Sequence, residues 1–432
     1  MIANRLKINE YNMMRHPFIC NRICLISVLL VLSLTACNPE ELDTPVAVTA
    51  VSVSPASADM KVGQTLQLSA EILPANATEK TVSWTTSDAS IASVDQNGML
   101  SALKEGSAVI TVTTQDGGKT GTCNVSVTKA KIEDIIVRSK VVSGTVTNGV
   151  KLSYSGTVFN RIYLLLPKPT SNEYQDITNF EAPGCTEGDC PDGVNHYIWK
   201  DINSSSEIPS SGDWVISETF DATVYNIKVD FSLMSDIPEY DPESEECKNY
   251  LGKEEGGLID PTNKKIVSTA NTLWELTGGN IIDYARECLG WTYANMTYGN
   301  MNTGLHTIAN LMSTMTGDCG NYSSVFISLL RAKGIPARHI VMVHGWKNEF
   351  HVRAEFYIPS YGWIPADPTW GDGYFGVFNG DYIVMTRGIN TILRGFDASD
   401  FRADLFQTFF YWYWLQKEGS DMEFTHSCTG LR

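Results

Sequence analysis

Positive charge is scarce in this sequence of 432 residues. Lys and Arg number 32 against 49 Asp and Glu, which gives a formal net charge of −17 at pH 7. This acidic balance argues against nucleic acid and anionic lipid surfaces as partners, because both attract basic proteins. Long apolar runs are also missing after residue 36, so no later helix is expected to cross a membrane. The hydrophobic share of 43% suits globular protein, and the length suits two to four domains.

The first 36 residues have the features of an export signal. Basic residues precede an apolar run from Ile23 to Ala36 that is short for a bilayer-spanning helix. Leu34-Thr35-Ala36-Cys37 resembles the bacterial lipobox, which implies cleavage before Cys37 and lipidation of its thiol. The alternative is an unmodified cysteine beside an ordinary cleavage site. We therefore expect a signal peptide at 1–36, a lipidated tether at 37–45, and attachment to the outer membrane, on its periplasmic side or at the cell surface.

The remaining cysteines differ in their surroundings. Cys185 and Cys190 flank a turn-rich loop, and a small local disulfide between them is expected in an oxidising compartment. A metal site is the weaker alternative for this pair, since no neighbouring pair completes it. Cys319 stands apart, because the sequence around it has a clear pattern.

Residues 46–128 are predicted to form short strands separated by turns. Val51-Ser52-Val53, Thr65–Leu68 and Val109–Val112 alternate apolar and polar side chains, Trp84 is the expected core aromatic, and Asn97-Gly98 signals a tight turn. Together with Val82-Ser83-Trp84-Thr85-Thr86-Ser87-Asp88, these residues resemble the bacterial immunoglobulin-like group 2 domain. The resemblance implies a β-sandwich that acts as a spacer or an adhesion module. No cluster of acids or histidines in this segment suggests chemistry.

The rest of the chain changes from strands to helices. Residues 131–235 are again rich in predicted strands, and helices are expected at about 262–277 and 280–289. Between them, the segment 236–261 is rich in Asp, Glu, Pro and Gly, which is typical of a domain boundary.

The cysteine pattern begins at Gly317-Asp318-Cys319-Gly320. It opens a predicted helix, Asn321–Lys333, whose apolar residues recur at helical spacing and whose end is marked by Gly334 and Pro336. A thiol at a helix N-terminus lies in a field that favours the thiolate. The alternative is an inert, buried cysteine.

A histidine and a carboxylate follow in chain order. The strand His351–Tyr357 alternates, with His351 and Arg353 on one face and Val352 and Ala354 directed to the core. A turn centred near Ser360 would place Asp367 opposite Arg353, one alternate position from His351. The carboxylate would then be close enough to orient the imidazole. Cysteine, histidine and carboxylate together form the set that a thiol nucleophile needs.

These motifs resemble the transglutaminase-like core. The resemblance rests on Gly317–Tyr322, Leu329–Arg338, His351–Tyr357 and Tyr361-Gly362-Trp363-Ile364-Pro365-Ala366-Asp367-Pro368-Thr369, and it covers about residues 250–395. It implies a multidomain chain that ends in an α+β, papain-like cysteine enzyme core. In that core Cys319 is the nucleophile, His351 the general base and acid, and Asp367 the orienting carboxylate. More loosely, 131–235 resembles the β-domain that precedes many bacterial members, and 396–432 is expected to be a C-terminal extension.

Two further positions follow from the same resemblance. Trp291-Thr292-Tyr293 matches the place of a family tyrosine, so an oxyanion-hole role is expected for Tyr293 or Trp291, with packing as the alternative. Many members carry tryptophan two residues after the histidine, whereas this chain has Arg353. This departure affects the substrate or acceptor pocket but removes no member of the triad.

Other patterns carry less chemistry. His339 and His344 have no common metal-ligand spacing, so no metal and no other cofactor is expected. The six aromatics Phe409–Trp414 are interpreted as packing, with a sugar-stacking surface as the alternative. The sequence thus predicts an exported, lipid-anchored thiol enzyme that hydrolyses or transfers acyl groups of peptide-like substrates. The competing hypothesis is a catalytically silent surface or adhesion protein.

Overall fold

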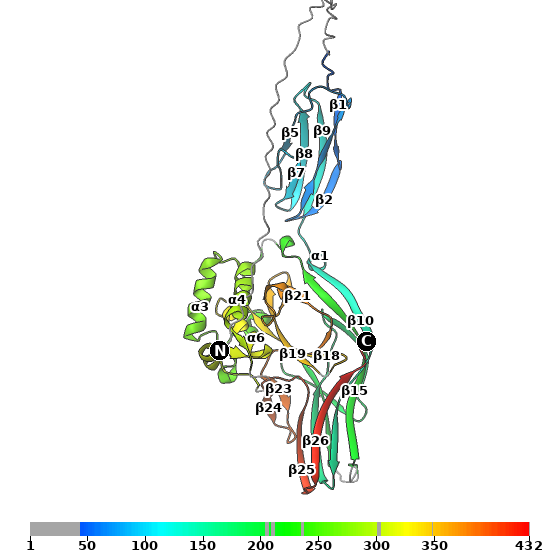
Figure 1. Ribbon diagram of the computed structural model, residues 1–432, viewed down its shortest axis with the longest axis vertical. Helices are drawn as coiled ribbons and strands as arrows, with labels where there is room; N and C mark the ends of the chain where they lie inside the picture. Colours follow the sequence, from blue (N-terminus) through cyan, green and yellow to red (C-terminus); the bar gives the residue numbers. More distant parts are fainter. Residues whose placement is uncertain are drawn as a thin grey trace, which may run out of the picture. The chain divides into compact units, whose positions relative to one another are not determined.

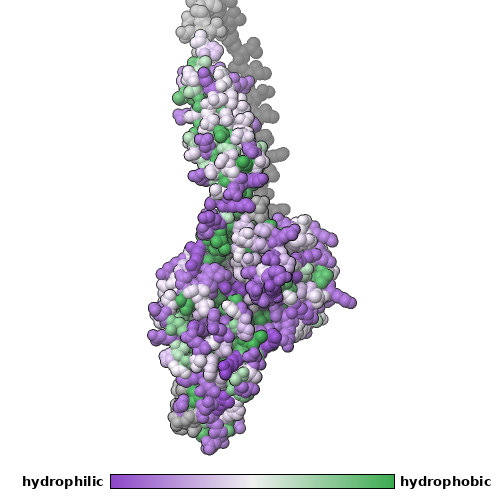
Figure 2. Space-filling model, turned by 180° about the vertical axis from the view of Figure 1, so that it is seen from behind, coloured by the Kyte–Doolittle hydropathy of each residue, from purple (hydrophilic) through white to green (hydrophobic). Residues whose placement is uncertain are grey.

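The computed structural model describes residues 44–203, 207–208, 212–234, 237–299, 304–347 and 349–431. The predicted signal peptide, Cys37 and nearly all of the tether lie outside the described residues. Within the described part, no helix is both long and apolar enough to cross a membrane. On the face that Figure 2 shows, hydrophilic residues predominate and hydrophobic residues are scattered in small groups.

The N-terminal domain is a β-sandwich. Its strands form the pair β1-β4, the sheet β2-β9-β8-β5 and the sheet β3-β7-β6 (Figure 1). Trp84 lies in the core between them and is 5% exposed, as expected. Gly98 has φ +81°, and a Cβ there would lie 2.8 Å from the carbonyl oxygen of Leu68, so the predicted tight turn requires glycine. The strands are β1 (Ala50–Ser54), β2 (Ser57–Lys61), β3 (Thr65–Gln67), β4 (Ser69–Leu73), β5 (Val82–Thr86), β6 (Ala92–Val94), β7 (Met99–Ala102), β8 (Gly106–Thr114) and β9 (Thr120–Thr128).

A second β-domain follows the short helix α1 (Ile132–Ile135). It contains the sheets β12-β15-β10-β26 and β13-β14-β11-β25. Its strands are β10 (Ile136–Ser155), β11 (Val158–Pro167), β12 (Gln175–Glu181), β13 (Thr186–Asp189), β14 (His196–Ile202), β15 (Gly212–Val229), β25 (Phe410–Lys417) and β26 (Ser420–Thr429). The last two strands come from the segment expected to be a C-terminal extension. They complete both sheets and cover edges that β10 and β11 would otherwise expose, so this segment is part of the β-domain.

The aromatic run 409–414 forms most of β25, and its rings pack on both sides of the strand. Trp412 contacts Tyr163 and Phe396, whereas Tyr411 stacks on Phe424 of β26 at 3.9 Å between ring centroids. The expected packing role is therefore confirmed. Tyr411 remains 42% exposed.

Cys185 and Cys190 do not form the expected disulfide, and both thiols are free. The loop between them is strand β13, paired with β14. Five extended residues span roughly 16 Å, which is far beyond the Cα separation of about 7 Å that a disulfide tolerates. Residues separated by an odd number of positions along a strand point to opposite faces. Cys185 and Cys190 accordingly pack in different apolar clusters. The turn signal Gly188-Asp189 concealed this strand.

The C-terminal half of the chain forms an α+β core. Helix α6 (Cys319–Arg331) packs against α3 (Lys264–Leu276), α4 (Ile281–Asn295) and α5 (Ile308–Thr314), and it also contacts the sheet β20-β19-β18-β22 (Figure 1). The sheet strands are β18 (Ala337–His344), β19 (Phe350–Ile358), β20 (Gly362–Ala366) and β22 (Tyr382–Arg387). Helix α6 ends as predicted, because Gly334 adopts φ +74° and the Ile335 N–H reaches back to the Leu330 carbonyl. Shorter elements are α2 (Glu245–Tyr250), β16 (Thr297–Tyr298), β17 (Thr316–Gly317), β21 (Val377–Phe378), β23 (Thr391–Arg394) and β24 (Asp400–Ala403).

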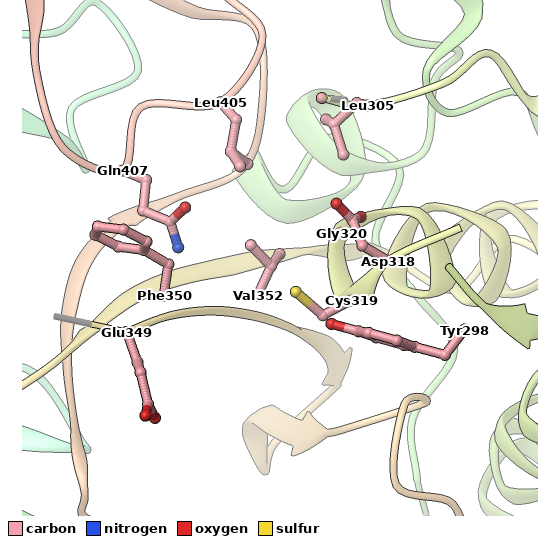
Figure 3. A pocket seen from close by; sticks show the side chains of 11 residues that line it. Tyr298, Leu305, Asp318, Cys319, Gly320, Glu349, Phe350, Val352, Leu405 and Gln407 are labelled. Carbon is pink, nitrogen blue, oxygen red and sulfur yellow. The ribbon is translucent and has the colours of Figure 1, made fainter. Parts of the chain in front are cut away.

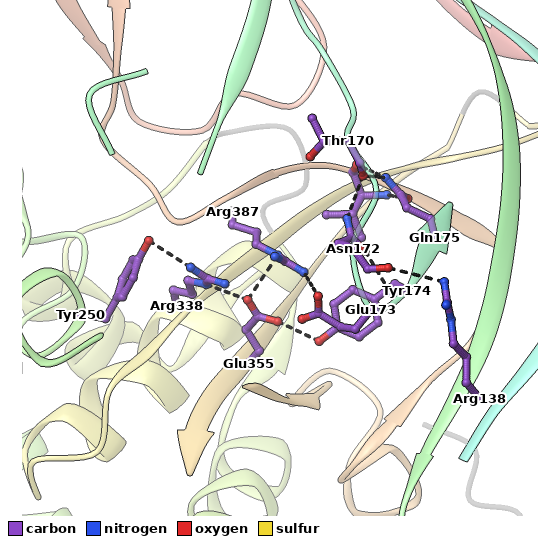
Figure 4. A network of polar contacts seen from close by, with 11 residues as sticks. Arg138, Thr170, Asn172, Glu173, Tyr174, Gln175, Tyr250, Arg338, Glu355 and Arg387 are labelled. Atoms are coloured by element: carbon purple, nitrogen blue, oxygen red, sulfur yellow. Dashed lines mark hydrogen bonds and ion pairs between the residues drawn. The ribbon is translucent and has the colours of Figure 1, made fainter. Parts of the chain in front are cut away.

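The polar side chains of β19 are buried as well as the apolar ones. Glu355 is 0% exposed and lies between Arg338 of β18 and Arg387 of β22, at 2.6 and 3.4 Å. The Tyr174 hydroxyl, from the β-domain, donates to the second Glu355 oxygen at 2.7 Å (Figure 4). The β-domain therefore covers a part of the sheet that sequence alone suggested to be a simple polar face. A buried carboxylate is tolerated here because two guanidinium groups and a phenol surround it.

A second buried carboxyl lies inside the β-domain. Glu218 of β15 is 0% exposed and accepts a hydrogen bond from Asn148 at 2.7 Å, while its other oxygen has no partner. Burial raises the pKa of Glu218 to about 8, because the interior disfavours the charged form.

We predict that Glu218 makes the stability of the protein fall as pH rises from about 5 to 8. In this window the folded state keeps the Glu218 proton and the unfolded state has lost it, so the free energy of unfolding decreases by up to about 1.4 kcal/mol per pH unit. Glu218→Gln should remove this dependence of stability on pH. The free energy of unfolding of the variant should therefore rise relative to that of wild type as pH increases. Denaturant unfolding of both proteins at pH 5, 6.5 and 8 checks this, and parallel profiles would contradict it.

Candidate active site

The cysteine motif is built around the first turn of α6. Asp318 is the N-cap, and its carboxylate accepts hydrogen bonds from the Asn321 N–H at 3.3 Å and the Asn321 Nδ2 at 2.8 Å. Gly317 is required, because a Cβ there would lie 2.4 Å from the Asn321 Cβ. Cys319 is thus the first helical residue, as predicted, and its thiol is partly exposed while most of α6 is buried.

Asn321 connects this helix start to the segment that precedes α5. Its side chain is fully buried, accepts from the His306 N–H at 2.8 Å and donates to the Gly304 carbonyl at 3.2 Å. These bonds hold Leu305 beside Gly320, where a Cβ would lie 2.8 Å from Leu305 Cδ2. Asn321 therefore shapes one wall of the space in front of Cys319.

The β19–β20 hairpin brings His351 and Asp367 together. Ile358 pairs with Gly362 and Ala354 with Ala366, so the turn is centred at Ser360, as predicted. Continuing this register by one residue places Asp367 opposite Arg353. His351 Nε2 lies 2.6 Å from Asp367 Oδ2, and the carboxylate is 0% exposed. The second oxygen, Oδ1, accepts from the Thr369 N–H at 3.0 Å.

Electrostatics favours a protonated ring on His351. Burial lowers the pKa of His351, but the hydrogen bonds with Asp367 and Cys319 outweigh burial and raise the pKa to about 9. Burial raises the pKa of Asp367. The hydrogen bond from His351, together with the other interactions of the carboxylate, outweighs burial and lowers this pKa. Because His351 Nε2 contacts Asp367, the other ring nitrogen, Nδ1, is the one available to interact with the Cys319 thiol. This arrangement can transfer a proton between a thiol and an imidazole.

Tyr298 occupies the position expected for Tyr293 or Trp291. β16 pairs in parallel with β17, opposite the start of α6, and the Tyr298 hydroxyl is hydrogen-bonded to both the thiol and the backbone N–H of Cys319. Burial, followed by the Cys319 and Asp318 charges, raises the pKa of Tyr298 to about 12, so this phenol keeps its proton.

The expected positions lie elsewhere. Tyr293 is 53% exposed, with its ring beside Gly371, and Trp291 lines a separate cavity with Lys265 and Met312. Both residues lie on α4, which continues to Asn295, and neither lines the cavity in front of Cys319. A two-residue parallel pair leaves no recognisable pattern in sequence, so Tyr298 could not be found that way.

A cavity of about 550 Å³ opens in front of Cys319. In Figure 3 the sulphur points into the space bordered by Val352 and Leu405, with the Tyr298 hydroxyl beside it. Gln407 is a further lining residue that sequence analysis missed. Its Nε2 donates to the carbonyls of Met342 and His351, at 2.8 and 3.1 Å, and so attaches the loop before β25 to the strand of His351. The full lining is Tyr298, Gly304, Leu305, Asp318, Cys319, Gly320, Glu349, Phe350, Val352, Leu405 and Gln407.

The other histidines of this region have separate surroundings. His339 is fully buried behind α6, where its Nε2 lies 3.2 Å from both Ser324 Oγ and the Gly320 carbonyl oxygen, and burial lowers its pKa to about 3. His344 packs against Trp346 and Tyr382. Across the described ranges, no three His, Cys, Asp or Glu side chains are grouped to hold a metal ion.

Relatives among known proteins share only parts of the chain. An uncharacterised protein of Clostridium acetobutylicum is 38% identical over 136 residues, which are 30% of this chain and 33% of that protein. An Ig-like virion protein of Serratia phage KSP90 is 43% identical over 83 residues, 19% of this chain and 32% of its own length. The chain thus spans about a third of the length of these two relatives.

Two solved structures match large parts of the chain at low sequence identity. A candidate cysteine protease from Cytophaga hutchinsonii is 15% identical, with a TM-score of 0.44 over 69% of this chain and 93% of that chain. A candidate protease from Parabacteroides distasonis is 12% identical, with a TM-score of 0.23 over 74% of this chain and 66% of that chain.

Family models match two segments. The bacterial Ig-like domain (group 2) matches residues 47–125, which form the N-terminal sandwich. The transglutaminase-like superfamily matches residues 270–368, which include Cys319, His351 and Asp367. The chain therefore combines a bacterial Ig-like domain of group 2 with an α+β core that contains a transglutaminase-like domain.

Proposed function

We propose that this protein is a thiol enzyme that forms an acyl-enzyme on Cys319 from peptide-like amides. The observation that carries the proposal is the buried 2.6 Å contact between His351 and Asp367, beside a thiol that opens into a cavity. An imidazole whose pKa is about 9 is protonated at neutral pH, and a cation next to a thiol at a helix N-terminus stabilises the thiolate.

Acylation uses groups that already lie in place. The Cys319 thiolate attacks the amide carbonyl carbon, and the electron pair of the C=O bond moves to oxygen. The Cys319 N–H and the Tyr298 hydroxyl can donate hydrogen bonds to this oxyanion. The His351 imidazolium then gives its proton to the amide nitrogen, the C–N bond breaks, and the amine leaves a thioester on Cys319.

Deacylation reverses the proton flow. His351 takes a proton from the attacking water or amine, the C–S bond breaks, and the thiolate–imidazolium pair is restored. Water gives hydrolysis and an amine gives cross-linking, and both share the same thioester. We favour hydrolysis for this exported chain.

The proposed location is the bacterial cell envelope. The Ig-like domain and the likeness to a phage virion protein support an extracellular or surface protein. We propose that Cys37 carries the lipid anchor, because the residues before it resemble a lipobox.

We predict that Cys319 reacts selectively with a thiol-directed electrophile. An alkyne derivative of iodoacetamide at pH 6 should label the peptide that carries Cys319, because ordinary thiols are protonated at this pH. Mass spectrometry identifies the labelled site. Cys319→Ala should abolish the label, whereas Cys185→Ala, which removes another partly exposed thiol, should leave it unchanged. Equal reactivity of Cys319 and Cys185 would overturn the enzyme proposal and favour a silent adhesion protein.

Tyr298→Phe should slow acylation much more than alkylation. The variant keeps the ring and loses the hydroxyl, so acylation by p-nitrophenyl acetate should fall by roughly 10²-fold, the usual effect of one oxyanion donor. Alkylation by iodoacetamide forms no oxyanion, so it should fall much less than acylation and reflect only the lost hydrogen bond between Tyr298 and the thiol. Tyr293→Phe is the matched control and should behave as wild type. An unchanged acylation rate in Tyr298→Phe would exclude its proposed role.

Cys37→Ala should prevent lipidation. Cells that express the full chain and are fed an alkyne fatty acid should incorporate it into wild type and into the control Cys24→Ala, but not into Cys37→Ala. Label retained by Cys37→Ala would refute the anchor.

A further inference from the structure

Arg353 is a buried charge next to the proposed triad. It is 2% exposed, and its Nε lies 3.1 Å from Asp367 Oδ2, the same oxygen that His351 contacts at 2.6 Å. Its guanidinium lies among the rings of Tyr374, Phe378 and Tyr382, at 5.2–6.0 Å from their centroids. The side chain thus approaches one carboxylate oxygen while aromatic faces surround its charge.

The two cations contact Asp367 in different ways. His351 makes a short, directed hydrogen bond, whereas Arg353 Nε is near the oxygen without hydrogen-bond geometry, and its Nε and Nη1 have no hydrogen-bond partner. Leaving these donors unpaired is unfavourable, so the attraction between the opposite charges must hold the guanidinium there. Arg353 therefore acts on Asp367 through its charge.

We propose that Arg353 is a positioning residue that shares Asp367 Oδ2 with His351 and weakens the hold of Asp367 on the imidazolium proton. The inference rests on the proposed function, because it concerns the proton that His351 delivers to the leaving group. The Arg353 guanidinium supplies a positive charge beside Asp367. It therefore keeps Asp367 ionised and in place when His351 becomes neutral.

Repulsion between the two cations is the physical basis. Without Arg353, Asp367 would interact with His351 alone, and the pKa of His351 would rise further above about 9. A stronger hold on the proton makes imidazolium a poorer acid toward the leaving nitrogen. The arginine, which stands where many transglutaminase-like sequences have tryptophan, thus sets the proton-transfer strength of the base.

Several other titratable groups surround this cluster. Tyr382 of β22 stacks near His351 at 5.6 Å, and burial raises its pKa. Glu349 and Asp381 also raise the pKa of Tyr382. Burial lowers the pKa of His344.

The other groups that face the cluster are the Cys319 thiol of α6 and the Tyr374 phenol. Cys319 is the group whose reaction is measured, and Tyr374 lies on the far side of the Arg353 guanidinium. Because both groups are present in every variant, a difference in the inflection between variants reports the change made at residue 353.

The test is the pH dependence of Cys319 alkylation by iodoacetamide in the full chain, from pH 4 to 11. In wild type the rate constant should show an upper inflection near pH 9, where the neighbouring imidazolium loses its proton. Arg353→Met should move this inflection upward by about one pH unit, because the cation that shares Asp367 Oδ2 with the imidazole has been removed. Arg353→Lys keeps the charge and should leave the inflection within a few tenths of a unit of wild type.

The outcomes separate the two proposals. If wild type shows no enhanced reactivity below pH 7 and no upper inflection, the thiolate–imidazolium pair is absent and the proposed function fails. If wild type shows both but Arg353→Met leaves the inflection unmoved, only the role of Arg353 is overturned. Arg353→Trp replaces the methionine variant if that one does not fold, and the same upward shift is expected. A purely structural role would lower stability without moving the inflection.

Discussion

Asp367 is a fully buried carboxylate, and a buried carboxylate stays ionised only when positive charge lies beside it. In this protein two cations, His351 and Arg353, lie beside one oxygen of Asp367. The hairpin of β19 and β20 places them there. The pairing keeps His351 protonated at neutral pH and holds its ring toward Cys319. The thiol chemistry proposed for Cys319 depends on this pairing more than on any feature of the cysteine itself.

Burial of both faces of the sheet makes this arrangement rigid. Helix α6 covers one part of the sheet, while Tyr174 and Gln175 of the β-domain reach its polar residues and backbone. The β-domain thus takes part in the core, because Tyr174 donates a hydrogen bond to the buried Glu355 on the strand that carries His351. The C-terminal strands β25 and β26 complete that domain, and the loop before β25 contributes Gln407 to the cavity.

Local sequence patterns predicted much of this site. The Gly317–Gly320 motif gave the helix start, Gly334 its end, and the turn centred at Ser360 gave the register that places Asp367 opposite Arg353. Each of these depends on residues close together in the chain. What sequence missed depends on long-range contacts: the two-residue pairing that delivers Tyr298, the return of β25 and β26, and the burial of Glu355. The extended loop between Cys185 and Cys190 was misjudged because its turn-forming residues lie in a paired strand.

The most direct test of the account is the titration of His351, followed by NMR of selectively labelled histidine in wild type and in Asp367→Asn. The account predicts a pKa of about 9 in wild type. In Asp367→Asn the pKa should fall well below this value, because burial remains while only Cys319 is left to oppose it. An ordinary pKa in wild type, or the same pKa in both proteins, would contradict the central role of the buried His351–Asp367 contact.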